Sequence, residues 1–126
     1  MEAINSLEAP AAVGPYSHAI RTGDFLFCSG QIPLDPTTGE IIEGGIEMET
    51  RQVFKNIRAV LATAGTTLDK VAKTTIFLTD MADFPAVNGI YGGEFGDHKP
   101  ARSTVAVAAL PLGAAVEIEC VVDLSE

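Results

Sequence analysis

Three ionisable residues in the last quarter of the chain have types and spacing that could support chemistry. Arg102 begins one apolar stretch, and Glu117 and Glu119 lie in the next one. A guanidinium binds a carboxylate through two parallel hydrogen bonds, and a glutamate can pass a proton to or from a reacting group. The combination predicts a binding site for a small anion. The alternative interpretation is an exposed sheet face that carries ordinary surface charges.

The two apolar stretches predict a β-hairpin, because the Leu110–Gly113 segment between them contains the proline and glycine of a tight loop. The register that pairs apolar residues with one another aligns Val105 with Ile118. Alternate side chains of a strand point to opposite faces of the sheet. The face opposite this apolar pair would then carry the three charged side chains, with Thr104 beside them.

The remaining hydrophobic pattern predicts strands alternating with two amphipathic helices. The predicted elements are strands at 17–22 and 24–30, a loop at 31–45, a helix at 47–64, a strand at 73–79, a helix at 83–95 and the C-terminal hairpin. Gly65 stands where a left-handed helix end belongs, and Asp83 could cap the second helix. This order predicts an α+β fold, a single mixed β-sheet with the two helices packed on one face.

Length and composition favour one globular domain that spans residues 1–126. The 47% hydrophobic content argues against disorder, and the net charge of −9 argues against a nucleic-acid partner. The chain has no apolar run of membrane-spanning length, and its first residues lack a signal-peptide pattern, so we expect a soluble cytoplasmic protein.

Metal ions and cofactors are not predicted by the sequence. The two cysteines, Cys28 and Cys120, lie within apolar runs, and the two histidines, His18 and His98, are far apart in the chain. Neither pair has the spacing of a metal site, and the glycine pairs lack the spacing of a phosphate-binding loop. We therefore expect no cofactor and no metal.

Four further residues are candidates for a ligand pocket, each with a plainer alternative. Tyr16 follows Pro15 and could be presented to a pocket, or could be an amphipathic ring at the edge of the core. Ser29 and Gly30 end a predicted strand, where a glycine permits close approach of a ligand or forms a simple bulge. Asn88 is polar beside the apolar side of the second helix, and faces either a pocket or the neighbouring loop.

Motifs along nearly the whole chain resemble one known family, the RidA/YjgF family of reactive-intermediate (enamine/imine) deaminases. They are Gly14–Ser17, Ser29–Asp35 with Thr38–Glu40, Thr50–Val53 with Asn56 and Ile57, Val71–Thr75, Asp83–Phe84 with Val87 and Asn88, Pro100–Ser103, and Leu110–Pro111 followed by Val116–Glu119. Their order and spacing match the family. One difference is Thr104, where many members have a cysteine, and it excludes thiol chemistry at that position.

The resemblance implies a chorismate-mutase-like fold (bacillus type) that assembles as a homotrimer with sheets lining its centre. It implies that Arg102 holds the substrate carboxylate and that Glu117, favoured over Glu119 by family position, transfers the proton. Backbone groups at Gly30 and Thr104 would supply hydrogen bonds. The implied substrate-binding set is completed by Tyr16, Ser29 and Asn88.

The implied activity is hydrolysis of 2-imino and 2-enamino acids, such as 2-iminobutyrate and 2-aminoacrylate, to 2-oxo acids and ammonia. It needs orientation of the acid, a positioned water and one proton shuttle. A non-catalytic module that binds small carboxylates is predicted equally well by Arg102. RNA cleavage or inhibition of translation, also attributed to the family, is disfavoured by the acidic charge and the absence of a basic stripe.

The predicted register also bears on assembly. It places Glu117 opposite Ala106, roughly 13 Å along the strand from Arg102 at about 3.3 Å per residue. A three- or four-carbon substrate is much shorter than this gap. We therefore expect sites at the interfaces of an obligate homo-oligomer, where a neighbouring chain brings its Glu117 to this Arg102.

Overall fold

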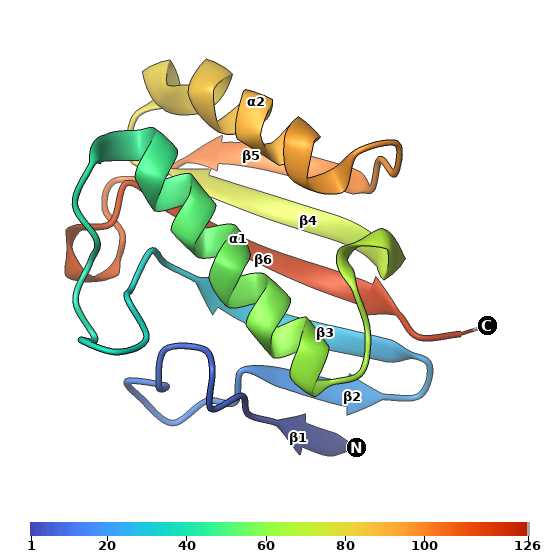
Figure 1. Ribbon diagram of the computed structural model, residues 1–126. Coiled ribbons are helices and arrows are strands. Elements are labelled where there is room, and N and C mark those ends of the chain that lie inside the picture. The colour runs from blue at the N-terminus through green and yellow to red at the C-terminus, as the bar shows by residue number, and fades with distance from the viewer. Residues whose placement is uncertain (126) are drawn as a thin grey trace.

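Six strands form one mixed sheet, and two helices cover one of its faces (Figure 1). The computed structural model describes residues 1–125. The strands are β1 (Glu2–Ile4), β2 (Ala19–Thr22), β3 (Phe25–Gln31), β4 (Val71–Leu78), β5 (Ala101–Ala106) and β6 (Val116–Asp123). The helices are α1 (Gly45–Thr63) and α2 (Phe84–Phe95), and short 3₁₀ turns lie at Leu68–Lys70, Met81–Asp83 and Pro111–Gly113. The predicted α+β class and the single helix-covered face are confirmed.

The strands lie in the order β1-β2-β3-β6-β4-β5 across the sheet. Neighbours are antiparallel except β4 and β5, which are parallel. Parallel neighbours need a long crossover connection, and α2 supplies it. The predicted strands at 17–22 and 24–30 correspond to β2 and β3, and a turn at Gly23, whose φ is +57°, joins them as an antiparallel pair. The sheet also contains β1, which the sequence analysis did not predict; three residues are too few to show an alternating pattern.

The predicted C-terminal hairpin is wrong. β4 lies between β5 and β6, and pairs with both (Figure 1). The segment from Val107 to Ala115 spans this gap and includes a 3₁₀ turn, so it is not a tight hairpin loop. Local apolar pairing suggested the hairpin, whereas burial favours placing β4, the more apolar strand, at the inside and β5 at the edge.

The helix boundaries agree with the sequence pattern to within a turn. α1 ends before Gly65, which has φ +80° and provides the left-handed end expected there. The predicted Asp83 cap is not formed: Asp83 makes no side-chain cap bond, and Asp80 accepts from the Ala82 N–H at 2.9 Å one turn earlier. The chain thus enters α2 through a 3₁₀ turn, which moves the capping position upstream.

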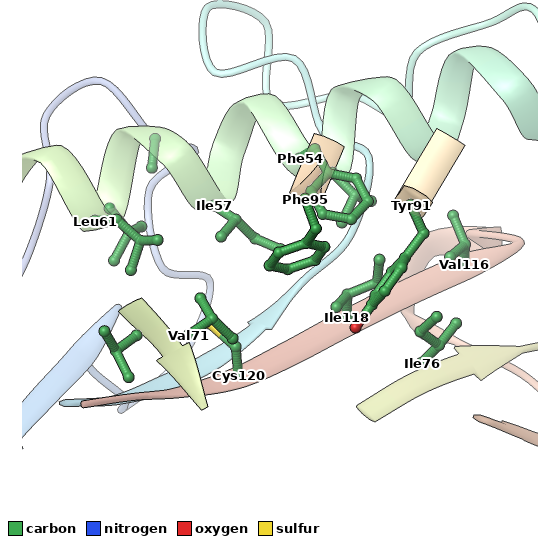
Figure 2. Packing of buried hydrophobic residues seen from close by; sticks show 14 of the residues in the cluster. Phe54, Ile57, Leu61, Val71, Ile76, Tyr91, Phe95, Val116, Ile118 and Cys120 are labelled. Atoms are coloured by element: carbon green, nitrogen blue, oxygen red, sulfur yellow. The ribbon is translucent and has the colours of Figure 1, made fainter. Parts of the chain in front are cut away.

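The core lies between the helices and the sheet (Figure 2). Phe54 of α1 is fully buried and packs edge-on against Tyr91 and Phe95 of α2, with ring centroids 5.9 and 5.8 Å apart. The alternate residues of β6 that face the helices, Val116 and Ile118 among them, are fully buried beneath these rings. Aromatic packing therefore fixes α2 against both α1 and the sheet.

Phe54→Ala should lower the free energy of unfolding by about 3–5 kcal/mol, because it removes a buried ring and leaves a cavity between both helices. Urea unfolding followed by circular dichroism measures the change. Leu7→Ala is the control: Leu7 is 100% exposed, and loss of its side chain should change stability by less than about 0.5 kcal/mol. A Phe54 variant as stable as the control would contradict this account of the core.

Candidate functional site

Arg102 lies at the edge of the sheet on the face that the helices cover. It pairs in register with Thr74, whose hydroxyl is hydrogen-bonded to Tyr91 of α2. Its Nη1 donates to Oδ1 of Asn88 at 2.7 Å, and its guanidinium lies 4.8 Å from the ring centroid of Tyr91 and 5.3 Å from that of Phe84. One hydrogen bond and two aromatic rings therefore orient the guanidinium, and its other N–H groups can bind a ligand.

A hollow of about 390 Å³ opens beside this guanidinium, between the C-terminal half of α2 and the start of β5. Lys99 and His98 line it together with Arg102 and Asn88. None of the described residues that line it carries a carboxylate. In a chain with a net charge of −9, this is a locally favourable place for an anion.

Glu117 occupies a second hollow, of about 360 Å³, on the face of the sheet that carries no helix. Tyr16, Ser29 and Gly30 line this hollow with it. Burial raises the pKa of the Glu117 carboxyl above its ordinary value, and the nearby charge of Glu119 raises it further. A carboxyl with a raised pKa is a better proton donor and acceptor near neutral pH than an exposed one.

A β-bulge brings Gly30 against Glu117. Cys28 pairs with Cys120 and Gln31 with Ile118, so Ser29 and Gly30 together face one residue of β6. A Cβ on Gly30 would overlap the Glu117 carboxylate and lie 2.8 Å from its Cδ. The predicted bulge is present. The group that approaches Gly30 closely is the Glu117 side chain of the same protein, and the predicted approach of a ligand stays a prediction.

The predicted placement of Arg102 and Glu117 on one sheet face is wrong. Arg102 aligns with Thr74 and lies on the helix-covered face, whereas Glu117 aligns with Phe77 and lies on the open face. The cause is the insertion of β4, which reverses the faces expected for β5. Their strands are also separated by two strand spacings, about 9–10 Å. A single chain therefore cannot place both groups on one small ligand.

The other predicted residues divide between the two faces. Tyr16, with 47% of its surface exposed, stands at the rim of the Glu117 hollow. Ser29 contributes less directly, because its hydroxyl donates to the Ser17 carbonyl at 2.7 Å. Thr104 shares the helix-covered face with Arg102, and its hydroxyl is buried with no hydrogen-bond partner among the described residues. Glu119, the rival carboxylate, is exposed on the open face.

Sequence reasoning missed the two rings that support Arg102 and the nearby lysine. Phe84 and Tyr91 both lie in the predicted helix at 83–95, and their spacing of two helical turns was the available signal. Lys99 carried no signal, because a lysine before Pro100 is unremarkable until the chain fold places it beside α2.

Within residues 1–125, no group of three or more histidine, cysteine, aspartate or glutamate residues is placed to hold a metal ion. No helix in this part of the chain has the length and apolar character needed to cross a membrane.

Comparisons with known proteins agree over nearly the whole chain. The profile of the Endoribonuclease L-PSP family matches residues 6–124. A RutC family protein of Pyrococcus horikoshii is 50% identical, covering 95% of each chain. A 2-iminobutanoate/2-iminopropanoate deaminase of Mus musculus is 45% identical, covering 94% of this chain and 87% of its own length. The crystal structure of E. coli TdcF with bound serine superposes with a TM-score of 0.94 at 37% identity, covering 99% of this chain and 100% of TdcF.

Gly30→Ala should reduce turnover more than stability. The overlapping atoms belong to the end of the Glu117 side chain, which can swing aside, so the added methyl should displace the carboxyl rather than unfold the sheet. We expect the melting temperature to change little while any activity that depends on Glu117 falls by on the order of tenfold or more. Gly89→Ala is the matched control, since a Cβ there meets nothing within 4 Å and should stabilise α2 by about 0.5–1 kcal/mol.

Glu117→Gln should stabilise the fold at neutral pH and much less at low pH. Because folding raises the pKa of this carboxyl, its ionised form is less favourable in the folded chain than in the unfolded one. That cost is present above the raised pKa and disappears as pH falls below the ordinary value of 4.5. Melting temperatures at pH 8 and pH 4 measure it, with Glu43→Gln, an exposed loop position, as the control for lost charge. An equal shift at both pH values would refute the burial argument.

Proposed function

The chain belongs to the RidA/YjgF family, the Endoribonuclease L-PSP family of its matching profile, and from this premise we propose that it hydrolyses small 2-imino and 2-enamino acids to 2-oxo acids and ammonia. The observation that carries the proposal is the pair formed by Arg102, oriented at an anion-favouring hollow, and Glu117, whose pKa is raised by burial. Relatives in mouse and Arabidopsis thaliana that carry deaminase names support the reaction class.

The proposed reaction is balanced by one water molecule. Arg102 binds the carboxylate of the imino acid through its free N–H groups. Water attacks the imine carbon, and Glu117 takes one proton of the water and passes it to the nitrogen, which gives a carbinolamine. The proton of the new hydroxyl group then moves to the nitrogen as the C–N bond breaks and the C=O bond forms, and ammonia leaves. An enamine first accepts a proton on carbon, which the protonated Glu117 can supply.

A carboxyl that both gives and takes a proton must not be locked in one state. Desolvation at the bulge raises the Glu117 pKa above its ordinary value, which makes the protonated form less costly to reach during the reaction. Glu119 is exposed and lies across from the bulge, where it supports this shift by its charge. This difference in burial favours Glu117 as the proton-transferring group and Glu119 as an accessory charge.

A second candidate is a carboxylate-binding module without catalysis. It is favoured by the TdcF structure, whose ligand serine carries a carboxylate that an arginine could hold. An endoribonuclease, as the family profile is named, is the least favoured alternative. The net charge of the chain is −9, so it would repel the phosphate backbone of RNA everywhere except at the hollow beside Arg102.

The proposal includes a homo-oligomer, a trimer by family resemblance. Arg102 and Glu117 lie on opposite faces of one sheet, so a second chain must supply one of them to a shared ligand. Three large hydrophobic residues on the open face are exposed to solvent: Phe25 by 46%, Phe27 by 47% and Val105 by 41%. Aromatic and aliphatic exposure on this scale is typical of a surface that a partner covers. Each interface would then hold one active site.

Arg102→Ala should abolish deamination while leaving the fold nearly intact, because Arg102 is exposed and its loss costs only surface contacts. We expect kcat/KM to fall on the order of 100-fold or more, the effect of losing a bidentate charged contact. Arg102→Lys should also be weak, since an ammonium cannot form the fork. The assay generates 2-aminoacrylate or 2-iminobutyrate with a dehydratase and follows loss of the transient species.

Near-native turnover by the Arg102→Ala variant would rule out the role assigned to Arg102. Binding of 2-oxobutyrate by the wild type without any turnover would favour the carboxylate-binding module.

Mixing two inactive variants, Arg102→Ala and Glu117→Gln, should restore part of the activity after subunit exchange. Some interfaces would then pair an intact Arg102 with an intact Glu117 from the other chain. Exchange is verified by mass spectrometry of differently labelled subunits, and wild-type protein taken through the same treatment controls for damage. Verified exchange without any recovery would refute the shared site.

A further inference from the structure

We infer that His18 is a positioning residue that holds one wall of the Glu117 hollow in place. The wall consists of Pro10, Ala11, Val13 and Tyr16, all of which line that hollow. His18 itself does not line it and is 97% removed from solvent, with 3% of its surface exposed. The effect on enzyme kinetics that we expect rests on the proposed function. The positioning role itself rests on hydrogen bonds alone.

Both ring nitrogens of His18 are used, and their partners determine the tautomer. The Ser6 N–H can only donate, so Nδ1, at 3.0 Å, must accept. The Pro10 carbonyl can only accept, so Nε2, at 2.7 Å, must carry the hydrogen and donate. The ring is therefore neutral. It bridges Ser6 and Pro10, and we call this pair of hydrogen bonds the His18 clamp.

The wall has few other polar attachments. Among the described residues, the hydrogen bonds that join residues 6–16 to another part of the chain both end on the His18 ring. Within the segment there are only local bonds, such as Tyr16 N–H to the Gly14 carbonyl at 2.9 Å. The position of the wall relative to the sheet thus depends on the ring together with the packing of Ala9 in the core.

The backbone of His18 also connects this clamp to the bulge. Its carbonyl accepts from the Ser29 N–H at 2.9 Å, and its N–H donates to Oδ1 of Asn5 at 3.1 Å. One residue therefore touches both sides of the hollow: the wall through its ring, and the Ser29–Gly30 bulge through its backbone. Substitution of the side chain removes the first connection and retains the second.

Because the ring contacts the wall and the backbone contacts the bulge, substitution of the His18 side chain should change one kinetic constant and not the other. The bulge and the Glu117 carboxyl should stay in place without the ring, so kcat should remain within about twofold of wild type. The wall should lose its fixed position, so KM for 2-iminobutyrate should rise about tenfold, the effect expected from one or two lost neutral hydrogen bonds.

Three substitutions separate hydrogen bonding from packing. His18→Leu keeps comparable volume and forms neither bond. His18→Gln can place a donor near the former Nε2, and His18→Asn can place an acceptor near the former Nδ1. Because Pro10 lines the hollow and Ser6 does not, KM should increase in the order wild type, Gln, Asn, Leu. A leucine variant with wild-type KM, or one closer to wild type than the glutamine variant, would overturn the inference.

Hydrogen exchange read by mass spectrometry tests the clamp without any substrate. Amides of residues 6–14 should exchange faster in His18→Leu than in wild type, and His18→Gln should restore part of their protection, while the peptide containing Ser29 stays unchanged. Unchanged protection of residues 6–14 in His18→Leu would refute the clamp. If wild-type protein fails to accelerate imine loss, the proposed function is wrong. Hydrogen exchange still decides the role of His18 in that case.

Discussion

The alternation of side chains along β6 is the constraint on which both halves of the proposed site depend. Val116, Ile118 and the buried residues that follow at every second position pack beneath the two helices. A strand that buries one set of side chains must present the other set on the opposite face. Glu117 and Glu119 therefore lie on the face without helices. No local change could bring Glu117 to the helix side without expelling core residues from it.

The crossover through α2 imposes the complementary arrangement on Arg102. A parallel strand that follows a helix packs beside the strand that preceded it, so β5 joins the edge of the sheet next to β4. The same crossover lays α2 along this edge, where Asn88, Tyr91 and Phe84 contact the guanidinium. The helix that completes the core thus also orients the cation, and the sheet separates this cation from the carboxyl.

The Glu117 hollow is built from less stable local structure than the core. A bulge interrupts the pairing of β3 with β6, a carboxyl is kept partly desolvated, and a nearby segment without regular secondary structure forms the wall. Each feature costs folding free energy that a regular strand would not. The neutral His18 ring offsets part of this cost by satisfying two buried backbone groups, the N–H of Ser6 and the carbonyl of the wall residue Pro10.

The sequence by itself determined both helices and five of the six strands, the α+β class with helices on one face, and the candidate residues Arg102 and Glu117, because hydrophobic periodicity, turn glycines and side-chain chemistry are local properties. It also offered a bulge as one of two reasons for the glycine at position 30. Only the tertiary structure decided which strands are neighbours, and hence which face each residue occupies. Strand order depends on contacts between distant segments: the local pattern of 101–122 fits a hairpin, but inserting β4 between β5 and β6 lets α2 cover a continuous apolar surface. The rings beneath Arg102 and the clamp at His18 follow from that arrangement, since their partners are distant in the chain and no spacing in the sequence encodes them.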